Sequence, residues 1–509
     1  MAAWHLQQGS GAKGEPSLSR TPNKPIDSIP VQRNNRLTSI LAPSKAAPLP
    51  EPTPALPIFP PDPEAPAAPA PTPKPRWSFA TRLAFRLGFC YLLIYALGCG
   101  NATLWEVIPF HIGGHLEDWT SWPFLHAAQW LGQHLFHLTG VGAKLHDTGS
   151  GDTILNWIAL GVMAVLALLL TLIWTLTDEL RPHRPLAYPR LFFWFRLILR
   201  LTLGYAMISY GLAKLFPLQM APPSLAVLNE PLGNTSPMTM LWTLIGLNPV
   251  YEMICGAAEC LAGILILFRR TGLLGALLTA FLATNIVLYN FCFDVPVKLY
   301  AAHLLLMSIA LLIPWTPALL NFFILHRPCA PSGGWTRPAR RYGTRVETLV
   351  TVIMLILVGG QACINLNQGY KRQRESQRHP SPYTGQWHVE SATLAGKPHP
   401  IPTGDGLPLT DIFMEPSGRT MLRDSSTVLW RGYAHADDTK HTFILASGDT
   451  ETTYDLRRLD PSHLLLTPNP KDKDAKTTPT LTLIRVPLPT HYPLQERGFH
   501  WVNEWGLER

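Results

Sequence analysis

Ionisable side chains lie inside apolar stretches of this 509-residue sequence, and these are the residues that could do chemistry. The stretch FDVPVKLYAAHLLLM, residues 293 to 307, places Asp294, Lys298 and His303 at the start of an apolar helix. A charged group inside a membrane span is costly unless it faces a bundle interior or water, so such groups are candidates for a functional site. We expect His303 to transfer protons and Lys298 to neutralise an anionic oxygen.

Three other apolar helices carry polar residues at a comparable depth. Each helix pairs two of them on one face: Glu252 with Glu259, Tyr210 with Lys214, and Asn285 with Tyr289. Because each face would be costly toward lipid, we expect the three faces to converge. The convergence predicts a polar site in the outer half of the membrane, with Glu259, Lys214 and His303 as its ionisable members. A structural ion-pair network explains the same residues, and both interpretations stay open.

Asp294 has two interpretations: it is a candidate contact for a bound ligand, and it is a candidate N-cap. It precedes Val295-Pro296, which is the arrangement of a helix N-cap followed by a proline in the first turn. Lys298 lies one turn later and could extend to the outer interface. We therefore predict that Asp294 caps the helix that contains His303.

The elements that position these residues are seven apolar runs, each long enough to cross a hydrocarbon layer of about 30 Å. The runs are Leu83–Gly100, Ile154–Thr177, Leu191–Leu212, Tyr251–Phe268, Leu273–Phe291, Leu299–Trp315 and Val346–Ile364. They indicate a multi-pass membrane protein of the all-α class, a bundle of about seven helices embedded in the lipid bilayer.

Basic residues set the orientation of these spans. The segments before span one and after spans two, four and six are all basic, which predicts that they are cytoplasmic. We therefore expect the N-terminus on the cytoplasmic side of a bacterial inner membrane and the C-terminal part on the periplasmic side. The basic segment KRQRESQR, residues 371 to 378, is the exception, since it follows the last span on the outer side. The net charge of +8 comes from the N-terminal tail and these loops, so it does not indicate nucleic-acid binding.

Five regions follow from the composition. Residues 1–77 are rich in Pro and Ala and form a disordered cytoplasmic tail, with no signal peptide. Residues 78–189 hold two spans and a His-rich outer loop, 190–320 hold a four-helix core, and 321–366 hold a cytoplasmic loop and the seventh span. Residues 367–509 change to short strands separated by turn signals, which predicts an extracytoplasmic all-β barrel or sandwich. Its last segment, RGFHWVNEWGLER, could lie at the membrane interface or pack on the β domain.

Other motifs favour structural roles. Six histidines occur in the first outer loop, but FLHAAQWLGQHLFHL is typical of an interfacial helix and no carboxylate ligand completes a metal site. In the following GSGDT segment, Asp152 or Thr153 is expected to cap span two. Cys99 and Cys292 should both lie near the outer ends of helices, and whether they form a disulfide stays open.

Several of these segments together resemble a known family. YGLAKLFPLQ, SPM, GAAECLAGILILFRRTGLLGALL and NFCFDVPVKLYAAHLLLM, which fall within residues 190 to 320, look like a DoxX-like integral membrane protein with a four-helix core. WLGQHLFHLTG, GSGDT and the terminal RGFHWVNEW resemble a longer, uncharacterised bacterial subgroup with an outer β domain. The resemblance implies a link to membrane redox chemistry, because some members, such as thiosulfate:quinone oxidoreductase subunits, are redox-associated. Other members have no established activity.

Two functions of different classes are compatible with these observations. In the first, the core binds a quinone-type or small hydrophobic molecule, with Glu259 and His303 handling protons and Lys214, Tyr210, Asn285, Asp294 and Lys298 contacting the ligand. The sequence has no haem, flavin or dithiol signature, so redox activity would need quinone or a partner subunit. In the second, the protein is a non-enzymatic envelope scaffold whose β domain binds a partner or lipid. Whether it is an enzyme stays open.

Overall fold

The computed structural model describes residues 76–98, 105, 108, 112–145, 149–182, 185–328, 341–378, 381–403, 406–415, 420–427, 429–437, 439–447, 450–472, 475–489 and 491–496. Residues 1–75 of the predicted disordered tail therefore lie outside the described residues. The aromatic segment RGFHWVNEWGLER, residues 497 to 509, falls outside them entirely.

Seven helices in the described part of the chain are long and apolar enough to cross a membrane, as predicted. They are α2 (Phe79–Gly98), α4 (Ile154–Glu179), α5 (Pro189–Leu215), α8 (Pro249–Leu267), α9 (Gly272–Cys292), α10 (Lys298–Leu312) continued by η4 (Ile313–Trp315) and α11 (Thr316–Phe323), and α12 (Arg341–Arg378). Their outward faces carry large apolar side chains such as Leu168, Phe281 and Ile356. An apolar exterior suits a bundle whose surroundings are lipid, so the protein is a multi-pass membrane protein.

Further helices connect the spans. They are α3 (Ile112–His134), η2 (Gly140–Ala143), α6 (Leu225–Leu228), η3 (Leu232–Asn234) and α7 (Pro237–Gly246). The starts of several helices follow from local sequence: Ser236 and Asn248 accept a backbone N–H at the beginning of α7 and α8, and each is followed by a proline. The predicted interfacial helix corresponds to the second half of α3, which leaves Trp122 and Trp130 exposed.

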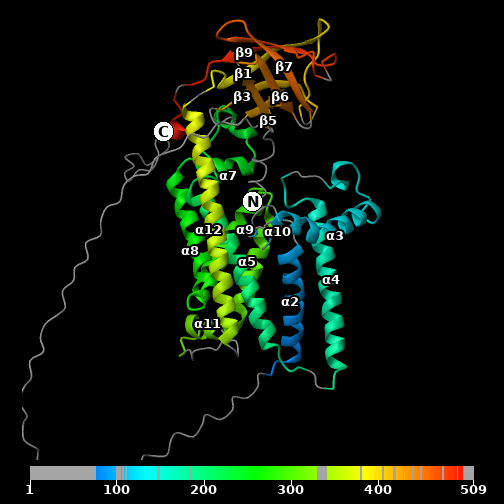
Figure 1. Cartoon of the computed structure of the whole chain (residues 1–509), viewed down its shortest axis with the longest axis vertical. Coiled ribbons are helices and arrows are strands. Elements are labelled where there is room, and N and C mark those ends of the chain that lie inside the picture. Colours follow the sequence, from blue (N-terminus) through cyan, green and yellow to red (C-terminus); the bar gives the residue numbers. More distant parts are fainter. Residues whose placement is uncertain are drawn as a thin grey trace, which may run out of the picture. The chain divides into compact units, whose positions relative to one another are not determined.

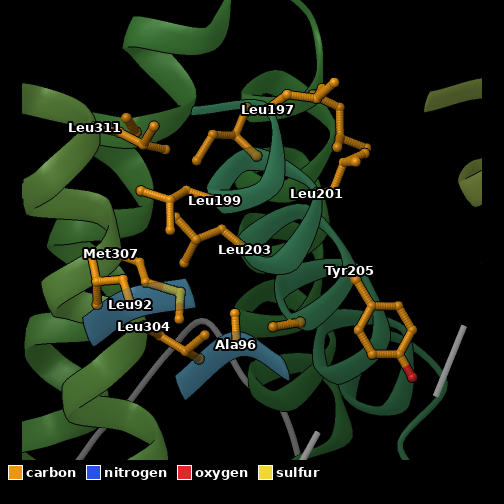
Figure 2. Packing of buried hydrophobic residues seen from close by; sticks show 14 of the residues in the cluster. Leu92, Ala96, Leu197, Leu199, Leu201, Leu203, Tyr205, Leu304, Met307 and Leu311 are labelled. Carbon is orange, nitrogen blue, oxygen red and sulfur yellow. The ribbon is translucent and has the colours of Figure 1, made fainter. Parts of the chain in front are cut away.

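The core of the bundle is built around α5, the most buried of the seven helices. Figure 2 shows its leucines packed against α10 and α2, with Leu199 and Leu203 pointing toward Met307 and Leu311. Leu92 and Ala96 of α2 complete this contact. The packing fixes α2, α5 and α10 as neighbours, and these helices carry most of the candidate site residues.

The C-terminal domain is a closed antiparallel barrel, which resolves the choice between a barrel and a sandwich. Eight strands follow one another as a meander, and β1 closes the barrel by pairing with β9. The strands are β1 (Gly385–Leu394), β3 (Leu409–Met414), β4 (Thr420–Asp424), β5 (Leu429–Asp437), β6 (Thr442–Ser447), β7 (Thr450–Arg458), β8 (His463–Pro468) and β9 (Thr480–Val486), with a two-residue strand β2 (Lys397–Pro398) on β1. Figure 1 shows the strands of this domain in the yellow to red colours of the C-terminal part of the chain. The basic segment 371–378 continues α12 as helix.

Alternation along each strand fills the barrel interior with apolar side chains. Trp387, Phe443 and Tyr454 are buried there together with leucines of β8 and β9. The indole N–H of Trp387 donates to the carbonyl of Tyr383 at 2.8 Å, so its polar atom is satisfied. A ring of buried aromatic and leucine side chains gives this domain its own core.

Candidate functional site

Lys214 of α5 and Glu259 of α8 form a buried ion pair. The ammonium Nζ lies 2.8 Å from Oε1 and 2.7 Å from Oε2, and only 6% of each side chain is exposed. The two helices approach closely at Gly211 and Gly256, each three residues before a member of the pair. A Cβ atom at Gly256 would lie 2.4 Å from the backbone nitrogen of Leu215, so this crossing needs glycine.

Tyrosines surround the ion pair. The Lys214 ammonium lies 5.8 Å from the ring centroid of Tyr210, one turn earlier on α5. Tyr289 of α9 interacts electrostatically with Glu259 and Tyr210. The structure therefore brings together Lys214, Glu259, Tyr210 and Tyr289, four residues on three of the predicted faces.

His303 lies in a separate set of contacts between α10 and α2. Its Nε2 is 2.7 Å from the hydroxyl of Tyr91, its Nδ1 is 2.7 Å from the carbonyl of Leu299, and its ring stacks on Tyr95 at 3.6 Å. Because a carbonyl can only accept, Nδ1 carries the proton in the neutral imidazole, and Nε2 accepts from Tyr91. His303 is 5% exposed and fully used by these contacts.

A row of aromatic side chains connects the two sets of contacts. The rings of Tyr210 and Tyr300 lie 6.0 Å apart, and Tyr300 lines a cavity that is also lined by Tyr95, the stacking partner of His303. The cavity has a volume of about 30 Å³, which is room for a water molecule. Its lining comes from α2, α3, α4 and α10, for example Phe124, Asn156 and Leu299, and from Gly151 in the segment before α4. The order along the row is thus Glu259, Lys214, Tyr210, Tyr300, the cavity, Tyr95 and His303.

The predicted N-cap role of Asp294 is wrong. The helix α10 begins at Lys298, and its first backbone N–H groups donate to Asp152: Lys298 N to Oδ2 at 2.6 Å, and Leu299 N to Oδ1 at 2.9 Å. Asp294 adopts a left-handed backbone with φ 53° and binds the Lys298 ammonium at 2.6 Å on the protein surface. Asp152 takes the cap because the GSGDT segment packs against this turn, where Gly151 N donates to Pro296 O at 3.0 Å.

The other predicted residues are distributed as follows. Thr153 caps α4, as expected of that segment. Asn285 is exposed on the outer face of α9. Cys292 is a free thiol, and its proposed partner Cys99 lies outside the described residues. Glu252 is completely buried and accepts the backbone N–H of Met220 at 2.9 Å, which ties the segment after α5 to α8.

The histidines of the outer loop do not meet at a metal site in the part that the structure covers. His126 and His134 stack on Trp122 and Trp130 at 4.3 and 4.9 Å, four residues earlier on α3. No group of three or more His, Cys, Asp or Glu side chains with metal-binding geometry occurs among the described residues. His111 and His146 lie outside them.

Two buried ion pairs at the opposite end of the bundle were missed by sequence reasoning. Arg86 of α2 binds Asp178 of α4 at 2.9 Å, and Arg200 of α5 binds Glu347 of α12 at 2.5 Å. Arg86 entered the prediction only as one of the basic residues that orient the first span, and Arg200 was not singled out. Their spacing held a further clue, since Arg86 and Arg200 each follow another arginine by four residues inside an apolar run, where a charge needs a partner.

The chain is similar to a protein of Bacillus subtilis over part of its length. The uncharacterised protein YwoB of Bacillus subtilis (strain 168) is 36% identical over 113 residues, which is 22% of this chain and 71% of YwoB. No family model matches the chain. No solved structure matches it.

Proposed function

The chain belongs to the family of YwoB, and from the sequence resemblance of residues 190 to 320 we propose that it is a DoxX-like protein of the bacterial inner membrane that supports membrane redox chemistry. In this proposal the bundle binds a quinone-type or other small hydrophobic molecule. The observation that carries the proposal is the row of ionisable and aromatic side chains from Glu259 to His303.

The residues in this row supply the groups that such a ligand needs. The Lys214 ammonium and the Tyr210 and Tyr289 hydroxyls are hydrogen-bond donors that suit a quinone carbonyl or an anionic oxygen. Glu259 and His303 are the groups that would accept the two protons when a bound hydroquinone passes its two electrons to a redox partner subunit. The cavity at Tyr95 and Tyr300, about 30 Å³ in volume, holds a water rather than a quinone ring. Its role in the proposal is to carry protons between the two ends of the row.

The ligand itself would approach from the bilayer along α9. Tyr289 and Asn285 lie one turn apart on this helix, and Asn285 is exposed. Tyr289 is half-buried and interacts electrostatically with Glu259. A hydrophobic molecule at this surface would therefore reach the ion pair without crossing the protein core.

We test the proposal by mutating the two proton carriers separately. Glu259→Gln and His303→Gln should each lower quinone binding to the detergent-extracted protein by roughly tenfold, because each removes a buried charged or hydrogen-bonded group. Mass spectrometry of co-purified molecules and titration with a soluble quinone measure this. Tyr210→Phe, which keeps the ion pair, covers the case in which Glu259→Gln fails to fold.

The matched control is Glu252→Gln, which changes a buried carboxylate on the same helix outside the row. It should leave quinone binding within about twofold of the native protein, since Glu252 is hydrogen-bonded to the backbone N–H of Met220 and acts on Lys214 only through space. Unchanged binding in Glu259→Gln, His303→Gln and Tyr210→Phe would remove the proposal.

Orientation is part of the same proposal. Four segments at one end of the spans are basic, which supports a cytoplasmic start of α2 and a periplasmic barrel. A reporter enzyme that is active only in the periplasm, fused after Glu496, should be active. Activity of the same reporter fused at the turn around Arg270 instead would reverse the orientation.

A scaffold function is the second candidate, favoured by the polar bonds between the barrel and the loop from α5 to α7. Glu415 accepts the N–H of Leu225 at 2.6 Å, and Arg423 donates to the carbonyl of Asn229 at 3.3 Å. In this role the barrel would bind an envelope partner or lipid while the helices anchor it. Deleting residues 380–509 distinguishes the two functions. If the helical bundle alone restores full function in a knockout strain, the scaffold function is wrong.

A further inference from the structure

The second half of α12 exposes amide side chains within the length of a membrane span. Gln361 and Gln368 are exposed, and Asn365 is half-buried. Gln361 Nε2 donates to Asn365 Oδ1 at 3.0 Å, and no other hydrogen bond to either side chain occurs among the described residues. This helix is also the least buried of the seven spans. Lipid tails offer no hydrogen-bond partner to an exposed amide, so this surface needs a polar cover.

The charges that flank the span place these amides inside the bilayer. Arg345 and Lys371 lie at its two ends, and Glu347 is the one charged residue in the sequence between them. Gln361 precedes Lys371 by ten residues, which is about 15 Å along a helix. Since a hydrocarbon layer is about 30 Å thick, Gln361 lies near its middle when Lys371 is at the surface.

The register of α12 against α5 agrees with this depth. Glu347 binds Arg200 of α5 at 2.5 Å, and a Cβ atom at Gly369 would lie 3.6 Å from Leu218, three residues after the end of α5. Gln361 precedes Gly369 by eight residues, or about 12 Å along the helix. It therefore lies beside the last turns of α5 and not beyond the end of that span.

The amides belong to a seam with the spacing of a parallel helix pair. Leu357, Gln361, Ile364 and Gln368 follow one another at intervals of four, three and four residues, and all four are exposed or half-buried. This spacing puts the two amides at a positions and the two aliphatic residues at d positions of a heptad. A Cβ atom at Gly360, beside the seam, would meet no atom within 4 Å, so another helix can approach closely there.

A second copy of the chain supplies the matching polar groups. An amide carries both donors and an acceptor, so an identical amide is a sufficient partner. Copies of one chain enter the membrane in the same orientation, and a two-fold symmetric pair therefore has parallel α12 helices with equivalent a residues face to face. Polar a residues of this kind fix the register of a parallel pair. The seam ends at Lys371, where the like charges of two copies repel each other.

We propose that the chain forms a parallel homodimer through this α12 seam, with amide–amide hydrogen bonds at Gln361 and Gln368. The dimer covers polar groups that lipid cannot satisfy, and Leu357 and Ile364 pack between them. The interface does not rest on the quinone proposal, because it uses no residue of the row that ends at Glu259 and His303.

Dilution of fluorescently labelled full-length protein in lipid vesicles measures the dissociation constant of the dimer. Replacing both amides in one protein, by Gln361→Leu and Gln368→Leu, should raise that constant roughly tenfold, because the interhelical hydrogen bonds are lost and lipid accommodates leucine well.

The matched control is Thr348→Val, which also makes an exposed polar residue of α12 apolar. Its hydroxyl donates to the carbonyl of Thr344 at 3.0 Å, and it lies on a different face of the helix, so the constant should stay within about twofold of the native value. A native protein that is monomeric at every dilution, or a leucine variant that associates as tightly as the native protein, would overturn the dimer.

Disulfide cross-linking in native membranes covers the case in which the leucine variant fails to fold. Ile364→Cys, made together with Cys363→Ser, places a thiol in the seam and should yield a cross-linked dimer on mild oxidation. The native Cys363 is an exposed free thiol that lies about 100° around the helix from Ile364, so the native protein should cross-link roughly tenfold more slowly. Cross-linking through Cys363 at the same rate or faster would overturn this seam as the interface.

Discussion

The helical bundle and the barrel both have apolar cores, but they differ in what covers the outside and in the charged pairs enclosed within the bundle. The bundle is apolar outside, where Leu168, Phe281 and Ile356 are exposed, and holds charged pairs such as Lys214 with Glu259 inside. The barrel has an interior of leucine and aromatic side chains. The physical reason is that the surface of a bundle in lipid has to be apolar. Its polar groups therefore have to lie inside the bundle and be paired there. Chemistry is therefore expected inside the bundle and on the outside of the barrel.

The strongest test of this comparison is to leave one charge of the bundle unpaired. Glu259→Gln should lower the free energy of unfolding by about 3–5 kcal/mol, because the Lys214 ammonium would stay buried without a carboxylate. Replacing both residues by methionine should restore most of that loss, since an apolar pair has no buried charge. Thermal unfolding in detergent measures both variants.

The exposed pair provides the control for this prediction. Asp294→Asn breaks the ion pair with Lys298 and should lower the free energy of unfolding by less than about 1 kcal/mol, because 80% of the Asp294 side chain is exposed. If the exposed and the buried pair proved equally important, burial would not be what distinguishes the bundle interior.

A neutral buried group should matter less than a charged one. Tyr91→Phe removes the hydroxyl that donates to His303 Nε2 and leaves that nitrogen buried without a donor, which should cost about 1–3 kcal/mol. Since Tyr95 still stacks on the imidazole, the ring should keep its position. Melting temperature together with the NMR chemical shift of the His303 ring nitrogens checks this, and an unchanged Nε2 shift would contradict the assigned hydrogen bond.

Asp152 should contribute about 1 kcal/mol as the cap of α10, within the ordinary range for an N-cap. Asp152→Ala leaves the N–H groups of Lys298 and Leu299 without their acceptor, while Asp152→Asn keeps one acceptor oxygen and should lose less. Hydrogen exchange at these two amides is the direct measurement. Faster exchange after Asp294→Ala, but not after Asp152→Ala, would return the cap to Asp294.

The smallest effect is expected in the barrel interior, where the stability of the domain should depend on the protonation of Tyr454 only at alkaline pH. Burial raises the pKa of Tyr454 above its ordinary value of 10.0, and the nearby Asp472 adds to that increase. A raised pKa in the folded state means that the stabilisation is fully present below pH 10.0 and is lost as the pH rises above it. Tyr454→Phe should therefore change stability little at pH 7 and flatten the alkaline loss, measured by near-UV circular dichroism of the full chain. An alkaline transition of the same size in both proteins would show that another group controls it.

The sequence predicted the elements well because the signals for them are local. Seven apolar runs and the two-residue alternation of the β segments identify spans and strands without knowledge of their partners. The pairing of Lys214 with Glu259 was partly predictable too, because two buried charges of opposite sign on apolar helices need each other. The choice between a barrel and a sandwich was not predictable, since it depends on whether β1 reaches β9.

What only the tertiary structure decided is which charge meets which partner. The expected single site divides into an ion pair between α5 and α8 and a neutral His303 held by α2, because the close glycine crossing sets one contact and the α2–α10 packing sets the other. Asp152 replaces Asp294 as a cap for the same reason, since a segment distant in sequence packs against the turn. Local patterns determined that polar groups enter the membrane spans, whereas their partners depend on which helices cross and at what depth.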